Sequence, residues 1–393
     1  MTVAATGRAA ARPAMPAVLW PLLFGNFVIG TGVMAVPGTL NEISSGLQVS
    51  TATAGQLISA AAALMCVGAP LFAALVAGWD RRRLLALSML WFGLLHLACA
   101  WAPSFGWLLV MRVLAVVSPA IFTPQAAACV GLLVPPEQRG RAITFIFLGW
   151  SVASVLGMPI SAFIGGMLGW RAAFAGVAIF SLASAVWVWR SMPDGVKPPA
   201  LSLDAWKETF RSRPLMLCVA VTLLYSAGQF VLFSYFAPYY KQKIAATPAD
   251  LSLLFMWFGV FGFVGNMLMS RFIDRIGVHR AVMIGVAPMA LSMLIFPLGT
   301  SFLLAAVVAV PWALGCFSSN SAQQARLVSI APTLAAGSIA LNSSAMYAGQ
   351  AIGAASGGWL ISHGAMDSLH WAGFAGLLLS MAASALATRY ARR

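Results

Sequence analysis

One arginine of this 393-residue sequence lies inside an apolar stretch, where a charge is costly. Arg112 stands near the start of the segment 106–133. A charged side chain at the centre of a membrane helix costs at least about 2.5–3.5 kcal/mol on insertion scales, so such a residue is a candidate for function. Its guanidinium stays ionised and carries no protons, but it can attract an anionic solute or act on a neighbouring titratable group. The alternative is a side chain that snorkels to the nearer membrane surface.

Proton-carrying side chains are scarce in the apolar stretches. The carboxylates all fall in or beside the gaps between them: Glu42, Asp80, Glu137, Asp194, Asp204, Glu208, Asp250, Asp274 and Asp367. His96 lies within an apolar segment and is a candidate for proton coupling, because imidazole titrates near neutral pH. The alternative is that His96 only forms a hydrogen bond between helices. Asp80 and Asp274, in the gaps, are the other candidates for coupling.

Uncharged polar and aromatic side chains supply the remaining candidates for solute binding. Aromatic faces with a few amides suit neutral or weakly charged organic molecules. Together with Arg112, the candidates are Asn26, Thr31, Gln125, Trp150, Tyr225, Gln229, Phe261, Asn320, Gln323, Tyr347 and Gln350. The alternative is hydrogen bonding between helices for the amides and an interfacial belt for Trp and Tyr.

Motifs of enzyme chemistry are absent from the sequence. It has no H-E-x-x-H, no G-x-S-x-G and no phosphate-binding loop. The five cysteines lie in apolar stretches without a C-x-x-C pair, which favours core packing over a disulfide or metal site. We therefore predict neither a metal nor a cofactor, and a membrane-embedded enzyme is the less favoured alternative.

The elements that position these residues must be membrane helices. Only 8% of the residues are charged and 61% are hydrophobic, whereas soluble domains carry roughly 25% charged residues. Each apolar segment is close to the roughly 20 residues that cross a bilayer as a helix. The segments run over 18–38, 55–77, 84–101, 106–133, 142–165, 172–190, 215–237, 251–270, 281–298, 302–323, 338–361 and 371–388.

The basic residues indicate the orientation. Of the 23 Lys and Arg residues, 19 fall on one side when the gaps are assigned to alternate sides. This bias follows the positive-inside rule, so we predict that both termini are cytoplasmic. The net charge of +14 is then a topology signal, and no nucleic-acid partner is expected.

The sequence divides into two similar halves. We predict a tail at 1–17, a first half at 18–190, a linker at 191–213, a second half at 214–388 and a tail at 389–393. Asp80 after the second span has a counterpart in Asp274, 194 positions later. Gly157 has one in Gly353, 196 positions later. The predicted fold is an all-α integral membrane protein of twelve transmembrane helices in two pseudo-symmetric six-helix halves.

Several motifs in this order resemble the major facilitator superfamily, in particular its drug and sugar efflux permeases that exchange solute for protons. The matching residues are Gly30-Thr31-Gly32 with Pro37 to Leu40, Pro135 to Ala142, Gly157-Met158-Pro159 through Gly165-Gly166, Gly169-Trp170-Arg171, Leu341-Asn342 and Gly349 to Gly358. Arg112 matches the arginine of the family's fourth span, with Val116 in place of a glycine. Val33 stands where many relatives carry an acid.

The resemblance implies a monomeric transporter of the bacterial plasma (inner) membrane. It would export a small organic solute by alternating access, with protons as the coupled ion. An uncoupled facilitator or importer is the alternative, favoured by Val33. The glycines and Pro159 would form a stripe on which the halves rock. The resemblance also implies two cytoplasmic latches: Asp80 and Arg81 on the start of span eleven, and Asp274, Arg275 and Gly277 on the start of span five.

Overall fold

The computed structural model describes residues 16–76, 78–135, 138–197 and 203–391. Most of the predicted tails lies outside this range, as do Pro136 and Glu137 of the resemblance and 198–202 of the linker. The described residues form helices joined by turns, with no β-strand among them. Many large apolar side chains are exposed, for example Leu168 at 74% and Leu303 at 71%. A surface of this kind faces lipid.

The first half contains six membrane-crossing passes, several of them built from more than one helix. Its elements are α1 (Leu19–Gly38), α2 (Leu40–Gly46), α3 (Thr51–Leu75), α4 (Arg81–Ala100), α5 (Phe105–Ala115), α6 (Val117–Leu133), α7 (Arg139–Val152), η2 (Ala153–Gly157), α8 (Met158–Leu168) and α9 (Trp170–Ser191).

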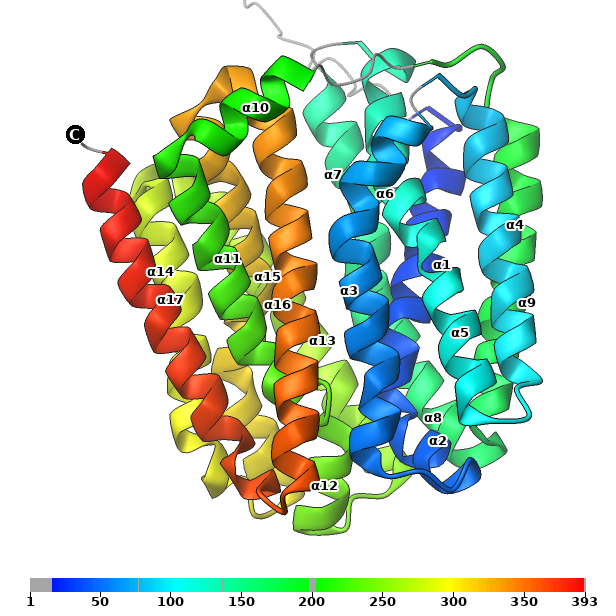
Figure 1. Cartoon of the computed structure of the whole chain (residues 1–393), viewed down its shortest axis with the longest axis vertical. Helices are drawn as coiled ribbons and strands as arrows, with labels where there is room; N and C mark the ends of the chain where they lie inside the picture. The colour runs from blue at the N-terminus through cyan, green and yellow to red at the C-terminus, as the bar shows by residue number, and fades with distance from the viewer. Residues whose placement is uncertain (1–15, 77, 136–137, 198–202, 392–393) are drawn as a thin grey trace, which may run out of the picture.

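The second half repeats this arrangement after a short linker helix, α10 (Leu203–Arg211). Its elements are α11 (Arg213–Phe233), α12 (Phe236–Ile244), α13 (Pro248–Ile276), α14 (Val278–Ile295), η3 (Phe296–Leu298), α15 (Phe302–Ile330), η4 (Pro332–Leu334), α16 (Ala335–Ser362), η5 (Met366–Ser368) and α17 (Leu369–Ala391). Figure 1 shows the two halves side by side, with α10 at one end and α2 and α12 at the other. We call these ends the linker side and the far side.

Eleven helical segments of the described residues are long and apolar enough to cross a membrane. The remaining predicted pass is α16, which has 28 residues and rises roughly 42 Å. Its sequence is rich in Gly, Ala and Ser, which lowers its mean hydropathy. It packs between α11 of its own half and α3 of the other. A helix in this position needs small side chains more than a lipid-facing surface.

The fourth and fifth passes each contain a local break beside a proline. The fourth pass is interrupted at Val116, three residues before Pro119. The fifth contains a π-helical turn, Ala153–Gly157, immediately before Met158 and Pro159. Proline removes an N–H from the helical ladder, and π turns are a recognised site of helix distortion. A π turn thus directly precedes Met158 and Pro159 in the fifth pass.

The halves meet mainly from the middle of the molecule to the far side. The Ser252 hydroxyl of α13 donates to the Pro159 carbonyl of α8 at 2.9 Å. One apolar cluster there contains residues of both halves, including Ile58 and Tyr235. Toward the linker side, the apolar clusters around Cys129 and around Cys218 each belong to a single half. The molecule is therefore joined more tightly at the far side.

Candidate functional site

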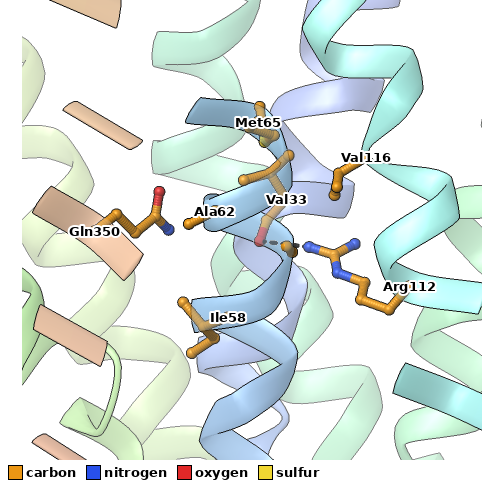
Figure 2. Close-up of a pocket in the computed structure, with 8 residues that line it drawn as sticks. Val33, Ile58, Ala62, Met65, Arg112, Val116 and Gln350 are labelled. Atoms are coloured by element: carbon orange, nitrogen blue, oxygen red, sulfur yellow. Dashed lines mark hydrogen bonds between the residues drawn. The ribbon is translucent and has the colours of Figure 1, made fainter. Parts of the chain in front are cut away.

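The Arg112 side chain is buried within the first half, with 2% of its surface exposed. Its Nη1 donates to the Gly32 carbonyl at 2.9 Å and lies 3.4 Å from Nε2 of His96. Its Nη2 donates to the Val33 carbonyl at 3.2 Å, which Figure 2 shows as a dashed line. The guanidinium thus points inward, between α1, α4 and α5. The snorkelling alternative is wrong for this residue.

A proline in α1 explains why a carbonyl is available to Arg112. In an α-helix the carbonyl of Val33 would accept from the N–H of residue 37. Pro37 has no N–H, so this carbonyl lacks its helical partner and the guanidinium takes the vacant place. Arg112 also stands in the last turn of α5, where the partial negative charge of the helix end favours a cation.

His96 is fully buried beside the guanidinium. Its ring lies between Phe92, with centroids 4.1 Å apart, and Phe174, at 5.7 Å. Nδ1 is 2.9 Å from the Phe92 carbonyl. If Nδ1–H donates there, Nε2 keeps a lone pair for Arg112, which is the neutral tautomer. A Cβ on Gly32 would lie 2.7 Å from Phe92 and 3.0 Å from Nε2, so this packing requires glycine.

A small cavity lies beside Arg112 and is lined by both halves. Its lining residues are Val33, Ile58, Ala61, Ala62, Met65, Arg112, Val116 and Gln350. Figure 2 shows Gln350 of α16 opposite Arg112, with the apolar side chains between them. The cavity holds about 10 Å³, which is room for one water at most. A solute can enter only after the halves move apart.

Val116 and Tyr347 contribute to the wall of this region. Val116, which replaces the glycine expected from the resemblance, packs with Ala61 and Met65 of α3. Tyr347 of α16 packs against the same cluster. Arg112, Tyr347 and Gln350 are therefore the predicted binding residues that the structure brings together at the interface of the halves.

Four other predicted binding residues of the second half bond within the protein. Tyr225 donates to Oδ1 of Asn320 at 3.4 Å, and Nδ2 of Asn342 donates to the same oxygen at 3.1 Å. Trp312 donates to Oε1 of Gln229 at 3.4 Å. Nε2 of Gln323 donates to the Cys218 carbonyl. These contacts join helices, as the alternative interpretation of the amides expects.

Of the remaining first-half candidates, two form hydrogen bonds within the protein and two have polar groups without a partner. Asn26 donates to the Ile146 carbonyl at 3.2 Å and accepts from Thr123 at 2.9 Å, while Thr31 bonds to its own helix. Gln125 has no hydrogen-bond partner within the described part of the chain, and neither does the buried Nε1 of Trp150.

Phe261, a candidate in the second half, lies 4.8 Å from the Trp257 ring. It is one of the partly buried residues packed against the large apolar cluster.

The glycine stripe lies at the interface of the halves in part only. A side chain on Gly157 would overlap Thr31 of α1, and one on Gly353 would meet the Ala227 carbonyl of α11 at 2.5 Å. Both glycines therefore join helices within one half. Glycines that do face the other half are Gly259, which faces Ser154 of the π turn, Gly166, which faces Pro248, and Gly55, which faces Tyr235. A Cβ on Gly358 would likewise lie 3.5 Å from the Ala52 carbonyl of the other half. The predicted stripe included Gly166 and Gly358, so it reaches the interface at those two positions and not at Gly157 and Gly353.

The Asp80 loop is engaged inside its own half. Asp80 accepts from the backbone N–H of Arg83 at 3.2 Å, which caps α4, and from that of Gly195 at 2.6 Å. Partial burial raises the pKa of this carboxyl, but the hydrogen bonds outweigh burial and the net pKa lies below its usual value. Arg81 donates to the carbonyls of Val76 and Trp79. The latch from Asp80 to α16 is not formed in this structure.

The predicted contact between the Asp274 loop and the start of span five is not formed either. Asp274 and Arg275 are exposed, and within the described residues Asp274 has no ion-pair or hydrogen-bond partner. Gly277 ends α13 with φ of +82°, a conformation that glycine adopts without strain. With both latches open, the linker side is the less closed end.

Arg326, one of the basic residues counted on the predicted cytoplasmic side, is a buried cation. It is fully buried in α15. Its guanidinium donates to Oγ of Ser384 at 3.0 Å and to Oγ1 of Thr388 at 3.0 Å, both on α17. The predicted span ended at 323, whereas α15 continues to Ile330. Because polar Ser and Gln residues precede Arg326, the apolar segment did not predict that the helix continues.

Comparison with known proteins identifies the family. The family model described as Major Facilitator Superfamily matches residues 22–245 and 219–393. This chain belongs to the Major Facilitator Superfamily. It is thus a multi-pass membrane protein of a family of transporters, not enzymes.

Several relatives carry informative names. The inner membrane transport protein YdhP of Escherichia coli is 30% identical over 88% of this chain and 89% of its own length. A chloramphenicol resistance protein of Streptomyces lividans is 33% identical over 66% of this chain and 68% of its own. The purine ribonucleoside efflux pump NepI of Shigella sonnei is 28% identical, over 70% and 69%.

A solved structure supports the same fold. The crystal structure of a D-xylose–proton symporter aligns with a TM-score of 0.75 and 17% sequence identity. The alignment covers 93% of this chain and 96% of that one. The predicted all-α major facilitator fold is confirmed.

Proposed function

We propose that this transporter exports a small organic solute from the cytoplasm by alternating access, through the cavity beside Arg112. The observation that carries the proposal is that cavity's lining, because it joins Arg112 of one half to Gln350 of the other. A site shared by two halves is exposed to one side or the other when the halves rock. The efflux-named relatives support export as the direction.

The linker side is the cytoplasmic side in this proposal. It carries the basic loops, including Arg82, Arg83, Arg271 and Arg275, and the positive-inside rule places such loops in the cytoplasm. The more open linker side then makes this an inward-facing arrangement. The solute would enter from the linker side and leave after the far-side contacts at Gly166 and Gly259 separate.

Exchange of the solute for protons is the first mode of energy coupling to test. His96 is the titratable side chain in contact with Arg112. Protonation would place an N–H of the ring against an N–H of the guanidinium and break their hydrogen bond. A change of protonation would therefore move Arg112, the residue that lines the cavity.

Uncoupled export is a second candidate. The positions of the acidic residues favour it, since within the described residues none lies at the depth of Arg112. Asp80, a predicted candidate for coupling, lies in a loop at the linker side. Without a carboxylate beside the cavity, an obligate proton exchange lacks its usual carrier.

Efflux from proteoliposomes tests the proposal. Vesicles loaded with chloramphenicol, inosine or another small solute are followed with and without an imposed pH gradient. We expect efflux of at least one solute above protein-free vesicles. Acceleration by the gradient in wild type that is lost in His96→Gln supports proton exchange. Equal rates with and without the gradient support the uncoupled candidate, and no efflux of any solute contradicts the proposed function.

A further inference from the structure

Within the part of the chain that the structure describes, the charge of Arg112 has no counter-ion. Its partners are the carbonyls of Gly32 and Val33 and the ring of His96, all of them neutral in this arrangement. The ion pairs of the described residues, Arg82–Asp194 and Lys243–Asp367, lie at the two ends of the molecule. A buried charge is costly unless a charge of opposite sign accompanies it. The site is therefore short of one negative charge.

Part of the guanidinium also lacks a hydrogen-bond acceptor. Arginine has five N–H groups. Two hydrogens of Nη1 serve Gly32 and His96, and one hydrogen of Nη2 serves Val33. Nε is buried without a partner. The remaining Nε–H and Nη2–H can form the fork that binds the two oxygens of a carboxylate.

The rest of the cavity wall is suited to an apolar molecule with few polar groups. Ile58, Ala61, Ala62 and Met65 of α3 provide an aliphatic surface. Across from Arg112, the Gln350 amide has no hydrogen-bond partner among the described residues. One cation, one free amide and an apolar surface between them describe the complement of an amphipathic anion.

We infer that the exported solute is an amphipathic organic monoanion whose carboxylate binds Arg112 while its apolar part lies on α3. This inference rests on the proposed function. The bound anion supplies the missing counter-charge and then leaves with the solute. Because the arginine is fixed to the protein, one negative charge crosses the membrane in each cycle.

The membrane potential alone then drives export. An inside-negative potential of 100 mV sustains about a fifty-fold gradient of a monovalent anion. Such transport needs no carboxylate at the depth of Arg112, which agrees with the position of the acids in the described part of the chain. The inference therefore selects the uncoupled candidate.

Matched pairs of solutes test the inference in proteoliposomes. Chloramphenicol monosuccinate is compared with chloramphenicol, and 4-phenylbutyrate with 4-phenylbutyramide. A potassium gradient with valinomycin sets the potential, and the pH is equal on both sides. We expect efflux of the anion at least tenfold faster than that of its neutral partner, and acceleration by an inside-negative potential.

Variants separate binding at Arg112 from a merely structural role. Arg112→Gln should lower the ratio of anion to neutral efflux at least tenfold, and Arg112→Lys should restore part of it. Arg171→Gln, at an exposed arginine that donates to the Ala102 carbonyl, is the matched control and should keep the wild-type ratio. If Arg112→Gln fails to fold, the wild-type pairs and their response to potential decide.

Failure of the inference can be distinguished from failure of the proposed function. Efflux of the neutral members with exclusion of the anions, or anion efflux that ignores the potential, overturns the inference and leaves the proposed function standing. Absence of efflux for every member of both pairs counts against the proposed function itself.

Discussion

At the scale of single residues, the side chains of Arg112 and His96 share one buried space against the backbone of α1. Pro37 frees the carbonyl of Val33 for Arg112, and Gly32 leaves room for His96. The sequence indicated Arg112 and His96 as separate candidates. It could not show that they touch, because they stand on different helices 16 positions apart.

Gly32→Ala tests this packing. The added methyl would press on Phe92 and on Nε2 of His96, and overpacking of this kind costs about 1–3 kcal/mol. We expect a lower melting temperature in detergent and slower efflux. Gly106→Ala, where a Cβ meets nothing within 4 Å, is the control and should behave as wild type. A Gly32→Ala protein with wild-type stability would contradict the packing described here.

Asp80→Ala tests the capping role assigned to this acid. Loss of the cap on α4 should cost about 0.5–2 kcal/mol. Since the folded pKa of Asp80 lies below its usual value, its contribution is present above the unfolded pKa of about 3.9 and is lost as the pH falls through the folded pKa.

The melting-temperature difference between wild type and Asp80→Ala should stay constant near neutral pH and shrink in acid. Asp367→Ala removes a weak exposed pair with Lys243 at 3.7 Å and should change little. A difference that grows in acid has the wrong sign for this account.

At the scale of elements, the sequence predicted where helices lie better than how they pack. The apolar segments predicted twelve passes, α16 among them, and eleven helical segments of the described residues are long and apolar enough to cross a membrane. The pairing of glycines with partners was not predictable. Gly157 and Gly259 are both small residues in apolar helices, and only the fold shows that the second faces the other half.

Gly259→Leu tests the contact between α13 and the π turn. A leucine there would collide with Ser154 across the interface and hold the far side apart. We expect a folded protein whose efflux falls at least tenfold. Gly176→Leu, where a Cβ has open space, is the control for an added leucine. Normal efflux by a folded Gly259→Leu protein would show that this contact does not gate transport.

At the scale of the whole molecule, the repeated sequence features predicted two halves, and the charge bias predicted their orientation. The sequence could not predict how far each side is closed. The Asp80 and Asp274 loops both carry residues predicted to form latches, and the sequence does not show whether these contacts are formed. The structure forms bonds at the far side and leaves Asp274 exposed at the linker side. The orientation itself stays a prediction.

Reporter fusions test the orientation. A reporter after Ser191 and one at the C-terminus should give a cytoplasmic signal, and one after Lys243 a periplasmic signal, because the basic loops lie on the linker side. The Lys243 fusion serves as the internal control for export of the reporter. A reversed pattern would mean that the linker side faces outward.

The central claim is that the cavity between Arg112 and Gln350 is exposed to the two sides of the membrane in turn. Ala62→Cys places a thiol in its wall, in a Cys66→Ser background because the other native cysteines are buried. Leu94→Cys, on an outward-facing surface of α4, is the control.

The decisive measurement is labelling of Ala62→Cys by a membrane-impermeant thiol reagent in right-side-out and in inside-out vesicles. Alternating access predicts labelling from both sides, a block of efflux after labelling, and no labelling of Leu94→Cys from either side. Labelling of Ala62→Cys from one side only, or from neither, in a protein that still transports would contradict the account.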